Sequence, residues 1–288
     1  MLAAPVLAVI GGSGLYNFSD LKDTQTIEVD TPFGPPSSPI TIGKLSGKPV
    51  AFLARHGIGH IYPPSEVPYR ANIYALKSLG VRRIVSVSAC GSLRESYAPG
   101  HIVIPNQIFD FTHQRKRSFF ETGLVAHVNV ADPFCEALSD VLEEAIQETG
   151  ATYHRGATYI TIEGPRFSTK GESNLYRLWD IDIIGMTASP EAFLAREAEI
   201  CYATMAHVTD YDVWHTTLES VTVEMIVQTL LNNLSVAQQA IKNMVAKIDP
   251  NVHCGCEDSL KDAIITNQDH IDPAMIEKRS LLMKKYLG

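Results

Sequence analysis

The sequence has no excess of basic residues, no long apolar run and few cysteines. It carries 24 Lys and Arg against 32 Asp and Glu, which gives a formal net charge of −8. A nucleic-acid-binding surface needs clustered positive charge and is not expected. No apolar run reaches membrane-spanning length, and the apolar start lacks the basic region and cleavage site of a signal peptide. We therefore expect a cytoplasmic protein without nucleic-acid or membrane partners.

The five cysteines cannot form an even disulfide framework. Cys90, Cys135 and Cys201 stand in apolar contexts that are typical of small buried thiols. Cys254 and Cys256 flank a single glycine, a spacing that is close for zinc chelation when no second pair of ligands is evident. We interpret them as reduced structural thiols or as a redox-labile disulfide, and no metal site is predicted.

The 288 residues include 45% hydrophobic residues, enough for an ample core. Apolar β-branched runs that alternate with amphipathic stretches predict an α/β fold. We expect a single domain over residues 1–288. Its three layers are a central mixed sheet and the helices that flank it on both faces. The predicted strands are residues 6–10, 84–89, 157–162, 181–184 and 200–208, with a hairpin of 40–42 and 50–54. The predicted helices are residues 69–79, 132–149, 172–179, 189–198, 222–247 and 260–265.

Two carboxylates follow the apolar strand 200–208. Asp210 and Asp212 are two residues apart, so both side chains are expected on one side, at the strand end where α/β proteins bind ligands. A carboxyl group against an apolar wall retains its proton near neutral pH and can act as an acid. The alternative is a strand end that carries two solvated aspartates. His207, deeper in the same strand, is interpreted as a core histidine with satisfied ring nitrogens.

Potential anion ligands follow other strands. Ser13 lies in the glycine-rich turn 11–14, which lacks both the Gly-Lys-Ser/Thr of a phosphate loop and the third glycine of a dinucleotide motif. Arg55 and His56 follow the hairpin. Ser88 stands near the end of the strand 84–89, just before a turn that is expected at residues 90–93. Guanidinium, imidazole and hydroxyl groups all donate to phosphate oxygens. An ordinary tight turn and an incidentally charged surface loop are the alternatives.

Further polar and aromatic residues follow the strands 157–162 and 181–184. Phe167 can stack on a flat ring or belong to the core, and Ser168 stands beside it. Met186 and Thr187 leave the next strand. Residues 110–121 combine aromatic and basic side chains, and we predict a site lid or a subunit contact there. The basic run 115–117 is expected to be solvated.

Taken together, these segments resemble the trimeric purine nucleoside phosphorylases, and among them most closely the S-methyl-5′-thioadenosine phosphorylases. The motifs that carry the resemblance are IGGSGL, ARHG, YRANIYALK, SACGSLR, TIEGPRFST, GMTASPE and VTDYD. The match runs from about residue 7 to 265, and the tail from about 266 shows no recognised resemblance. The resemblance implies the purine nucleoside phosphorylase fold and a reaction in which phosphate attacks C1′ of a nucleoside and releases the base.

The resemblance also assigns roles. Phosphate is held by Ser13, Arg55, His56, Ser88, Ala89 and Thr187, and the nucleoside by Phe167, Ser168, Met186, Asp210, Tyr211, Asp212 and Val223, with Val223 at the pocket for the 5′ group. Asp210 is the expected general acid at purine N7. Relatives that act on 6-oxopurines typically carry Asn there, so Asp predicts a 6-aminopurine.

Inorganic phosphate is then a co-substrate, and neither a cofactor nor a metal is needed. The resemblance implies a homotrimer or a dimer of trimers, with the 110–121 loop as the candidate segment contributed to a neighbouring subunit. Two alternatives remain open. One is a broader nucleoside phosphorylase that acts on adenosine or 6-oxopurine nucleosides, and the other is a non-catalytic nucleotide sensor.

Overall fold

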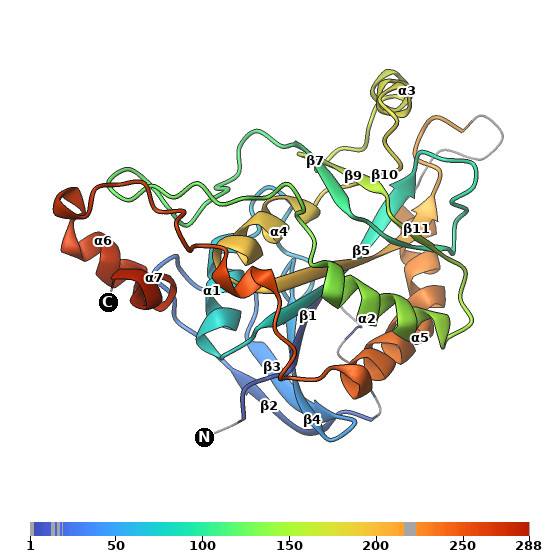
Figure 1. Cartoon of the computed structure of the whole chain (residues 1–288). Coiled ribbons are helices and arrows are strands. Elements are labelled where there is room, and N and C mark those ends of the chain that lie inside the picture. Colours follow the sequence, from blue (N-terminus) through green and yellow to red (C-terminus); the bar gives the residue numbers. More distant parts are fainter. Residues whose placement is uncertain (1–2, 13–14, 16–17, 19, 216–222, 288) are drawn as a thin grey trace.

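The computed structural model describes residues 3–12, 15, 18, 20–215 and 223–287; within 223–232 it describes the side chains of Glu224, Gln228 and Thr229. Among these residues, eleven strands form one mixed sheet (Figure 1). β1 (Leu7–Gly11) pairs in parallel with β4 (Lys48–Ala54) and β5 (Arg83–Ser92), and β5 pairs in parallel with β11 (Cys201–Asp210). The other strands are β2 (Lys22–Ile27), β3 (Ile40–Leu45), β6 (Ile102–Ile104), β7 (Gln107–Phe111), β8 (Tyr153–Arg155), β9 (Thr158–Ile162) and β10 (Ile183–Gly185).

The central parallel strands are buried on both faces, as their continuous apolar runs predict. All residues of β1 and β11 are buried. The predicted hairpin is also confirmed, because β3 and β4 pair antiparallel across the turn at Ser46 and Gly47, which both have positive φ. Since β1, β4, β5 and β11 run in one direction, their carboxyl ends lie at one edge of the sheet.

Helices cover both faces of the sheet, which confirms the three-layer architecture (Figure 1). α1 (Tyr69–Ser78) and α4 (Ala188–Glu197) pack against one face, and α2 (Glu136–Gln147) and α5 (Val223–Lys247) pack against the other. α3 (Lys170–Leu178) starts at a capping box that joins Thr169 and Glu172. In the part of the chain that the structure describes, no helix is long and apolar enough to cross a membrane.

The predicted turn at residues 90–93 is wrong, because β5 continues through Cys90 and Gly91 to Ser92. There it pairs antiparallel with β10, with Ser92 opposite Ile183 and Gly91 opposite Ile184. β10 therefore runs back along the C-terminal end of β5. This pairing explains how Ser88, a residue inside a strand, comes close to the residues that follow β10.

Two predicted helices also need correction: one starts later than predicted, and the other does not form. α2 begins at Glu136, with Cys135 as its N-cap residue, because the Cys135 N–H donates to Tyr202 O of β11 at 2.8 Å. The segment from residue 132 is thus tied to the sheet and is not yet helical. No helix forms over residues 260–265, since Ala263 O accepts from His127 N–H and Ile265 N–H donates to Val125 O.

The tail from residue 266, in which the sequence shows no recognised motif, is packed onto the core. It contains α6 (Pro273–Lys278) and α7 (Ser280–Leu287), and Leu282 and Met283 of α7 are buried in the same apolar cluster as α1. Arg279 is fully buried, and its guanidinium donates to Phe119 O at 2.5 Å and to Glu121 Oε2 at 3.0 Å. The tail therefore helps to hold the segment that contains Phe119 and Glu121.

Candidate active site

A cavity of about 740 Å³ opens where β1, β4, β5, β10 and β11 meet the N-terminal end of α4 and one side of α5. Most of the predicted site residues line it, although they come from segments far apart in the sequence. These residues are Arg55, His56, Ser88, Ala89, Phe167, Ser168, Met186, Thr187, Asp210 and Asp212. The convergence that the sequence predicted is therefore present in one cavity.

Three predicted residues are not among the described residues that line this cavity. Ser13 lies outside the described residues, although its neighbour Gly12 lines the cavity. Val223 is the first residue of α5, and its side chain lies outside the described part of the chain. Tyr211 does not line the cavity: its ring stacks on His215 with centroids 4.7 Å apart, and its hydroxyl donates to Glu95 O at 3.1 Å.

Arg55 follows β4 and is only 2% exposed. Its Nε and Nη2 donate to the two carboxylate oxygens of Glu191 at 2.7 and 2.8 Å, and Nη2 also donates to Ser86 Oγ at 2.6 Å. Nη1 donates to Val87 O at 3.2 Å. Burial opposes the charge of Arg55, but the Glu191 carboxylate outweighs it and raises the pKa of the guanidinium. Sequence reasoning missed Glu191, because an acidic residue in a first helical turn is ordinary.

This ion pair changes the expected role of Arg55 toward phosphate. Most of its donors already serve Glu191, Ser86 and a backbone carbonyl, so a bidentate grip on an anion is not available. One N–H of Nη1 remains for a ligand, since this nitrogen carries two hydrogens and donates one to Val87 O. Arg55 therefore offers a single donor and a positive field at the cavity wall.

His56 extends this polar wall as a neutral imidazole. Its Nδ1 lies 2.9 Å from Tyr62 O, so the proton is on Nδ1, because a carbonyl only accepts. Burial and the neighbouring charge of Arg55 lower the pKa of His56 to about 4. Its ring also stacks on His60, with centroids 4.3 Å apart. At neutral pH the other ring nitrogen, Nε2, therefore carries a lone pair.

Hydroxyl groups complete the polar part of the cavity. Ser88 is buried, and its Oγ makes no hydrogen bond within the described part of the chain. Thr187 is the N-cap residue of α4 and also lines the cavity, and its side chain makes no capping bond. Buried hydroxyls without partners are rare in folded proteins unless water or a ligand satisfies them. Ser88 and Thr187 are therefore suited to an anion in this cavity.

Asp210 ends β11 and is 7% exposed. Its Oδ1 accepts from Asp212 N–H at 2.8 Å, and its Oδ2 lies 2.6 Å from the Thr209 hydroxyl, which also lies 3.2 Å from Cys90 O. Burial raises the pKa of Asp210 and brings that of Asp212 to about 6. A Cβ on Gly91 would lie 3.0 Å from Asp210 Oδ1, so this approach requires glycine.

Apolar residues form another part of the cavity lining. Phe167 is 40% exposed, while the neighbouring Ser168 is buried with an Oγ that has no partner in the described chain. Met186 lies against Gly164, where an added Cβ would come within 2.6 Å of its Sδ. Phe167 and Met186 line the same cavity as Ile162 and Ile184, so part of its lining is apolar.

Arg115 corrects the prediction that the basic run 115–117 is solvated. Its side chain is 1% exposed, and Nη1 donates to Met186 O and Ser189 O at 2.6 Å each. Nη2 donates to Glu163 O at 2.8 Å. The loop 110–121 is thus fastened to the chain segments that follow β9 and β10, and whether it serves a neighbouring subunit stays a prediction.

His207 is not the satisfied core histidine that the sequence suggested. It is 1% exposed, and neither ring nitrogen has a partner among the described residues. Burial lowers its pKa to about 4, so the ring is neutral. It lines the cavity, as do Asn233, Leu234 and Ala237 of α5, which sequence reasoning did not place at the site.

The comparisons with known proteins agree with this geometry. A family model described as the phosphorylase superfamily matches residues 6–246. An S-methyl-5′-thioadenosine phosphorylase from Chloroflexus aurantiacus is 53% identical over 281 residues, which cover 97% of this chain and 98% of the relative. The crystal structure of a methylthioadenosine phosphorylase from an antarctic soil metagenomic library has a TM-score of 0.93 and 48% identity, with 97% and 99% of the two chains covered.

A more distant structure contains a nucleoside. It is a variant of the adenosine/methylthioadenosine phosphorylase from Schistosoma mansoni in complex with methylthioadenosine, with a TM-score of 0.80, 32% identity and coverage of 97% of this chain and 98% of that one.

Proposed function

This chain belongs to the phosphorylase superfamily and, within it, to the S-methyl-5′-thioadenosine phosphorylases, and we propose that it cleaves S-methyl-5′-thioadenosine with phosphate to adenine and 5-methylthioribose 1-phosphate. The observation that carries the proposal is the placement of a buried Asp210 in the same cavity as Arg55, His56, Ser88 and Thr187. A proton donor for the base and a set of anion ligands thus border one space.

At one end of the cavity, four groups bind the phosphate oxygens. They are the hydroxyls of Ser88 and Thr187, the Ala89 amide and one Nη1 hydrogen of Arg55. His56 Nε2 accepts a hydrogen bond from a phosphate hydroxyl, or donates one once the phosphate charge has raised its pKa. Ser13 belongs to the proposed set because it follows Gly12 in the glycine-rich turn. Phosphate below the ribose also stabilises the positive charge that develops at C1′.

At the purine end, Asp210 donates its proton to N7 while a phosphate oxygen bonds to C1′ and the C1′–N9 bond breaks. The bonding electrons pass to the purine, which leaves as neutral adenine, and Asp210 later regains a proton from solvent. The raised pKa of Asp210 supports this role, because a general acid must be protonated near the working pH. Phe167, Ser168 and Met186 hold the base and ribose, and Val223 borders the 5′ group.

A 6-amino group donates hydrogen bonds, and the carboxylate of Asp212 accepts them. A 6-oxo group presents an acceptor, which a carboxylate repels, so adenine-type bases are preferred. Adenosine is a second candidate substrate, since a relative of known structure is named an adenosine/methylthioadenosine phosphorylase. The proposal places Asp212 opposite the 6-amino group.

We further propose that the whole chain, 1–288, is one phosphorylase domain and that it works in the cytoplasm as a homotrimer or a dimer of trimers, without a cofactor. The family resemblance supports the assembly, and the net charge of −8 supports a protein without nucleic-acid partners. The loop 110–121 is the candidate contact between subunits.

The test identifies the sugar product that is released from the nucleoside. Purified protein is incubated with methylthioadenosine, with and without phosphate, and the products are followed by phosphorus NMR and chromatography. We expect adenine and a 1-phosphosugar only when phosphate is present. Release of free methylthioribose without phosphate would indicate a hydrolase, and no release at all would indicate a nucleotide sensor.

A further inference from the structure

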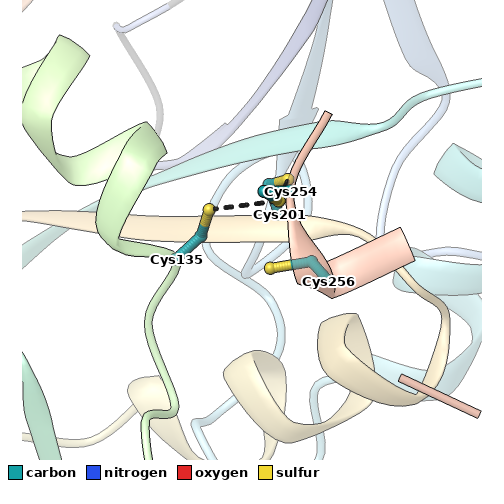
Figure 2. Close-up of side chains that lie close together, drawn as sticks. All are labelled: Cys135, Cys201, Cys254 and Cys256. Atoms are coloured by element: carbon teal, nitrogen blue, oxygen red, sulfur yellow. Dashed lines mark hydrogen bonds between the residues drawn. The ribbon is translucent and has the colours of Figure 1, made fainter. Parts of the chain in front are cut away.

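Four of the five cysteines lie close together (Figure 2). They meet at the start of β11, the opposite end of that strand from Asp210 and the cavity. Cys135 precedes α2, Cys201 begins β11, and Cys254 and Cys256 follow α5. Their sulfur atoms all lie within 4.8 Å of one another, and none is disulfide-bonded. The fold thus supplies the second pair of thiols that the Cys-Gly-Cys segment lacks in the sequence.

The distances fit a tetrahedral thiolate site. A zinc ion binds cysteine sulfur at ~2.3 Å, which places neighbouring sulfurs of a tetrahedron about 3.8 Å apart. The Sγ atoms of Cys135 and Cys254 are 3.7 Å apart, and those of Cys201 and Cys254 are 3.0 Å apart. Small side-chain rotations are therefore enough to place one ion at equal distance from all four sulfurs.

The segment that carries Cys254 and Cys256 is positioned by residues at the start of β5. Arg83 Nη2 donates to Asp249 O at 3.2 Å and to Val252 O at 2.7 Å, and Arg82 forms an ion pair with Glu257. Arg83 also pairs with Cys201 in the sheet. The contacts of Arg83 therefore keep the segment of Cys254 and Cys256 close to Cys201. Pre-positioned ligands lower the entropic cost of binding an ion.

The surroundings also suit a negatively charged cluster. Arg196 Nη1 lies 3.1 Å from Cys256 Sγ and can donate to a thiolate. Three of the four cysteines are buried and Cys254 is partly exposed, so an ion has a route of entry.

We propose that Cys135, Cys201, Cys254 and Cys256 bind one Zn²⁺ ion as a closed structural site. Each thiol that is still protonated releases one proton on binding, and no electron is transferred. Four sulfur ligands complete the tetrahedron and leave no open position, so the ion takes no part in chemistry. β11 spans ten residues from Cys201 to Asp210, about 30 Å at ~3.3 Å per residue, which separates the ion from the reaction.

The test begins with the full-length protein purified under reducing conditions and dialysed against metal-free buffer. Metal analysis is expected to find one zinc per chain, and X-ray absorption a sulfur shell at ~2.3 Å. Cys254→Ser and Cys256→Ser are expected to lose the zinc and to lower the unfolding temperature. Cys90→Ser, which changes the remaining cysteine, is the matched control and should keep the zinc.

A second experiment uses the wild-type protein, so that its result does not depend on whether the variants fold. The zinc is removed with a chelator under reducing conditions and cobalt(II) is added, which should give the visible absorption bands of tetrahedral cobalt thiolate. Zinc-free protein should also melt at a lower temperature and recover when zinc returns. Stoichiometric iron in place of zinc would overturn the assignment of the ion. Purified protein without metal would overturn the site altogether, whether its four thiols are free or, when purified without reductant, oxidised to two disulfides with the loss of four hydrogens.

Discussion

Glu191 and Arg55 form a buried, bidentate ion pair beside the proposed phosphate site, with N–O distances of 2.7 and 2.8 Å and side-chain exposures of 0% and 2%. Tyr202 adds a hydroxyl bond to Glu191 Oε1 at 2.8 Å. A residue predicted as an anion ligand is thus mainly held by the protein itself. The pair fixes the direction of the remaining Nη1 hydrogen and stabilises the junction of α4 with the sheet.

Glu191→Gln leaves the Arg55 charge buried without a counter-charge. We expect the free energy of unfolding to fall by about 3–5 kcal/mol, the usual effect of removing one partner of a buried ion pair. Urea unfolding measures it. The control is Asp23→Asn, which breaks the exposed pair of Asp23 with Lys44 and should leave the unfolding midpoint unchanged. Equal effects of the two variants would refute the structural role of Glu191.

Asp210→Asn removes the proton that is proposed to reach purine N7. We expect kcat for methylthioadenosine to fall by ~10²-fold or more, the scale of a lost general acid. Steady-state kinetics at saturating phosphate gives the value. Asp180→Asn, which changes an exposed carboxylate paired with Arg94, should retain full turnover. A fully active Asp210→Asn enzyme would remove the acid role from Asp210.

Asp212 should make stability depend on pH. Its pKa rises from 3.8 to about 6 on folding, so the folded protein binds the proton more tightly than the unfolded chain. This contribution is fully present below pH 3.8 and is lost as pH rises through 6, about 3 kcal/mol in total at ~1.4 kcal/mol per pH unit. The Asp212→Asn variant lacks this pH-dependent contribution to stability. Unfolding of both proteins at pH 4.5 and 7 should show the wild type losing stability relative to the variant as pH rises.

Arg115→Ala removes the guanidinium that joins the 110–121 loop to Met186 O, Ser189 O and Glu163 O. Buried carbonyls would lose their donors, so we expect a loss of at least ~2 kcal/mol of stability and a higher KM for the nucleoside. Denaturant unfolding and initial rates measure the two effects. The neighbouring Lys116 is exposed, and Lys116→Ala should change neither. Wild-type stability in Arg115→Ala would show that the loop is held by other contacts.

The sequence predicts best what depends on short-range patterns. The continuous apolar runs of β1 and β11 have few interpretations other than buried strands, and the polar residues that follow them fall at one sheet edge. Asp210, Arg55 and Ser88 were therefore found from residue type and position along the chain. The same reasoning placed a turn after Ser88, because nothing local shows that β10 pairs with Gly91 and Ser92.

What the sequence could not predict depends on partners far away in the chain. Glu191 resembles any acidic first-turn residue until Arg55, 136 positions earlier, is seen against it. The Cys-Gly-Cys segment resembles half a metal site until Cys135 and Cys201 approach it. His207 has an apolar sequence context, which gives no sign that its ring nitrogens lack partners in the described structure.

The central claim is that one cavity holds phosphate and a 6-aminopurine nucleoside on opposite sides of a single ribose. The most direct measurement is kcat/KM for methylthioadenosine, adenosine, inosine and methylthioinosine, side by side and with phosphate present. We predict that methylthioadenosine exceeds methylthioinosine by about 10²-fold or more, since an oxo group leaves the aspartate pair without a donor. Equal values for the two, or a preference for the 6-oxo nucleosides, would contradict the account.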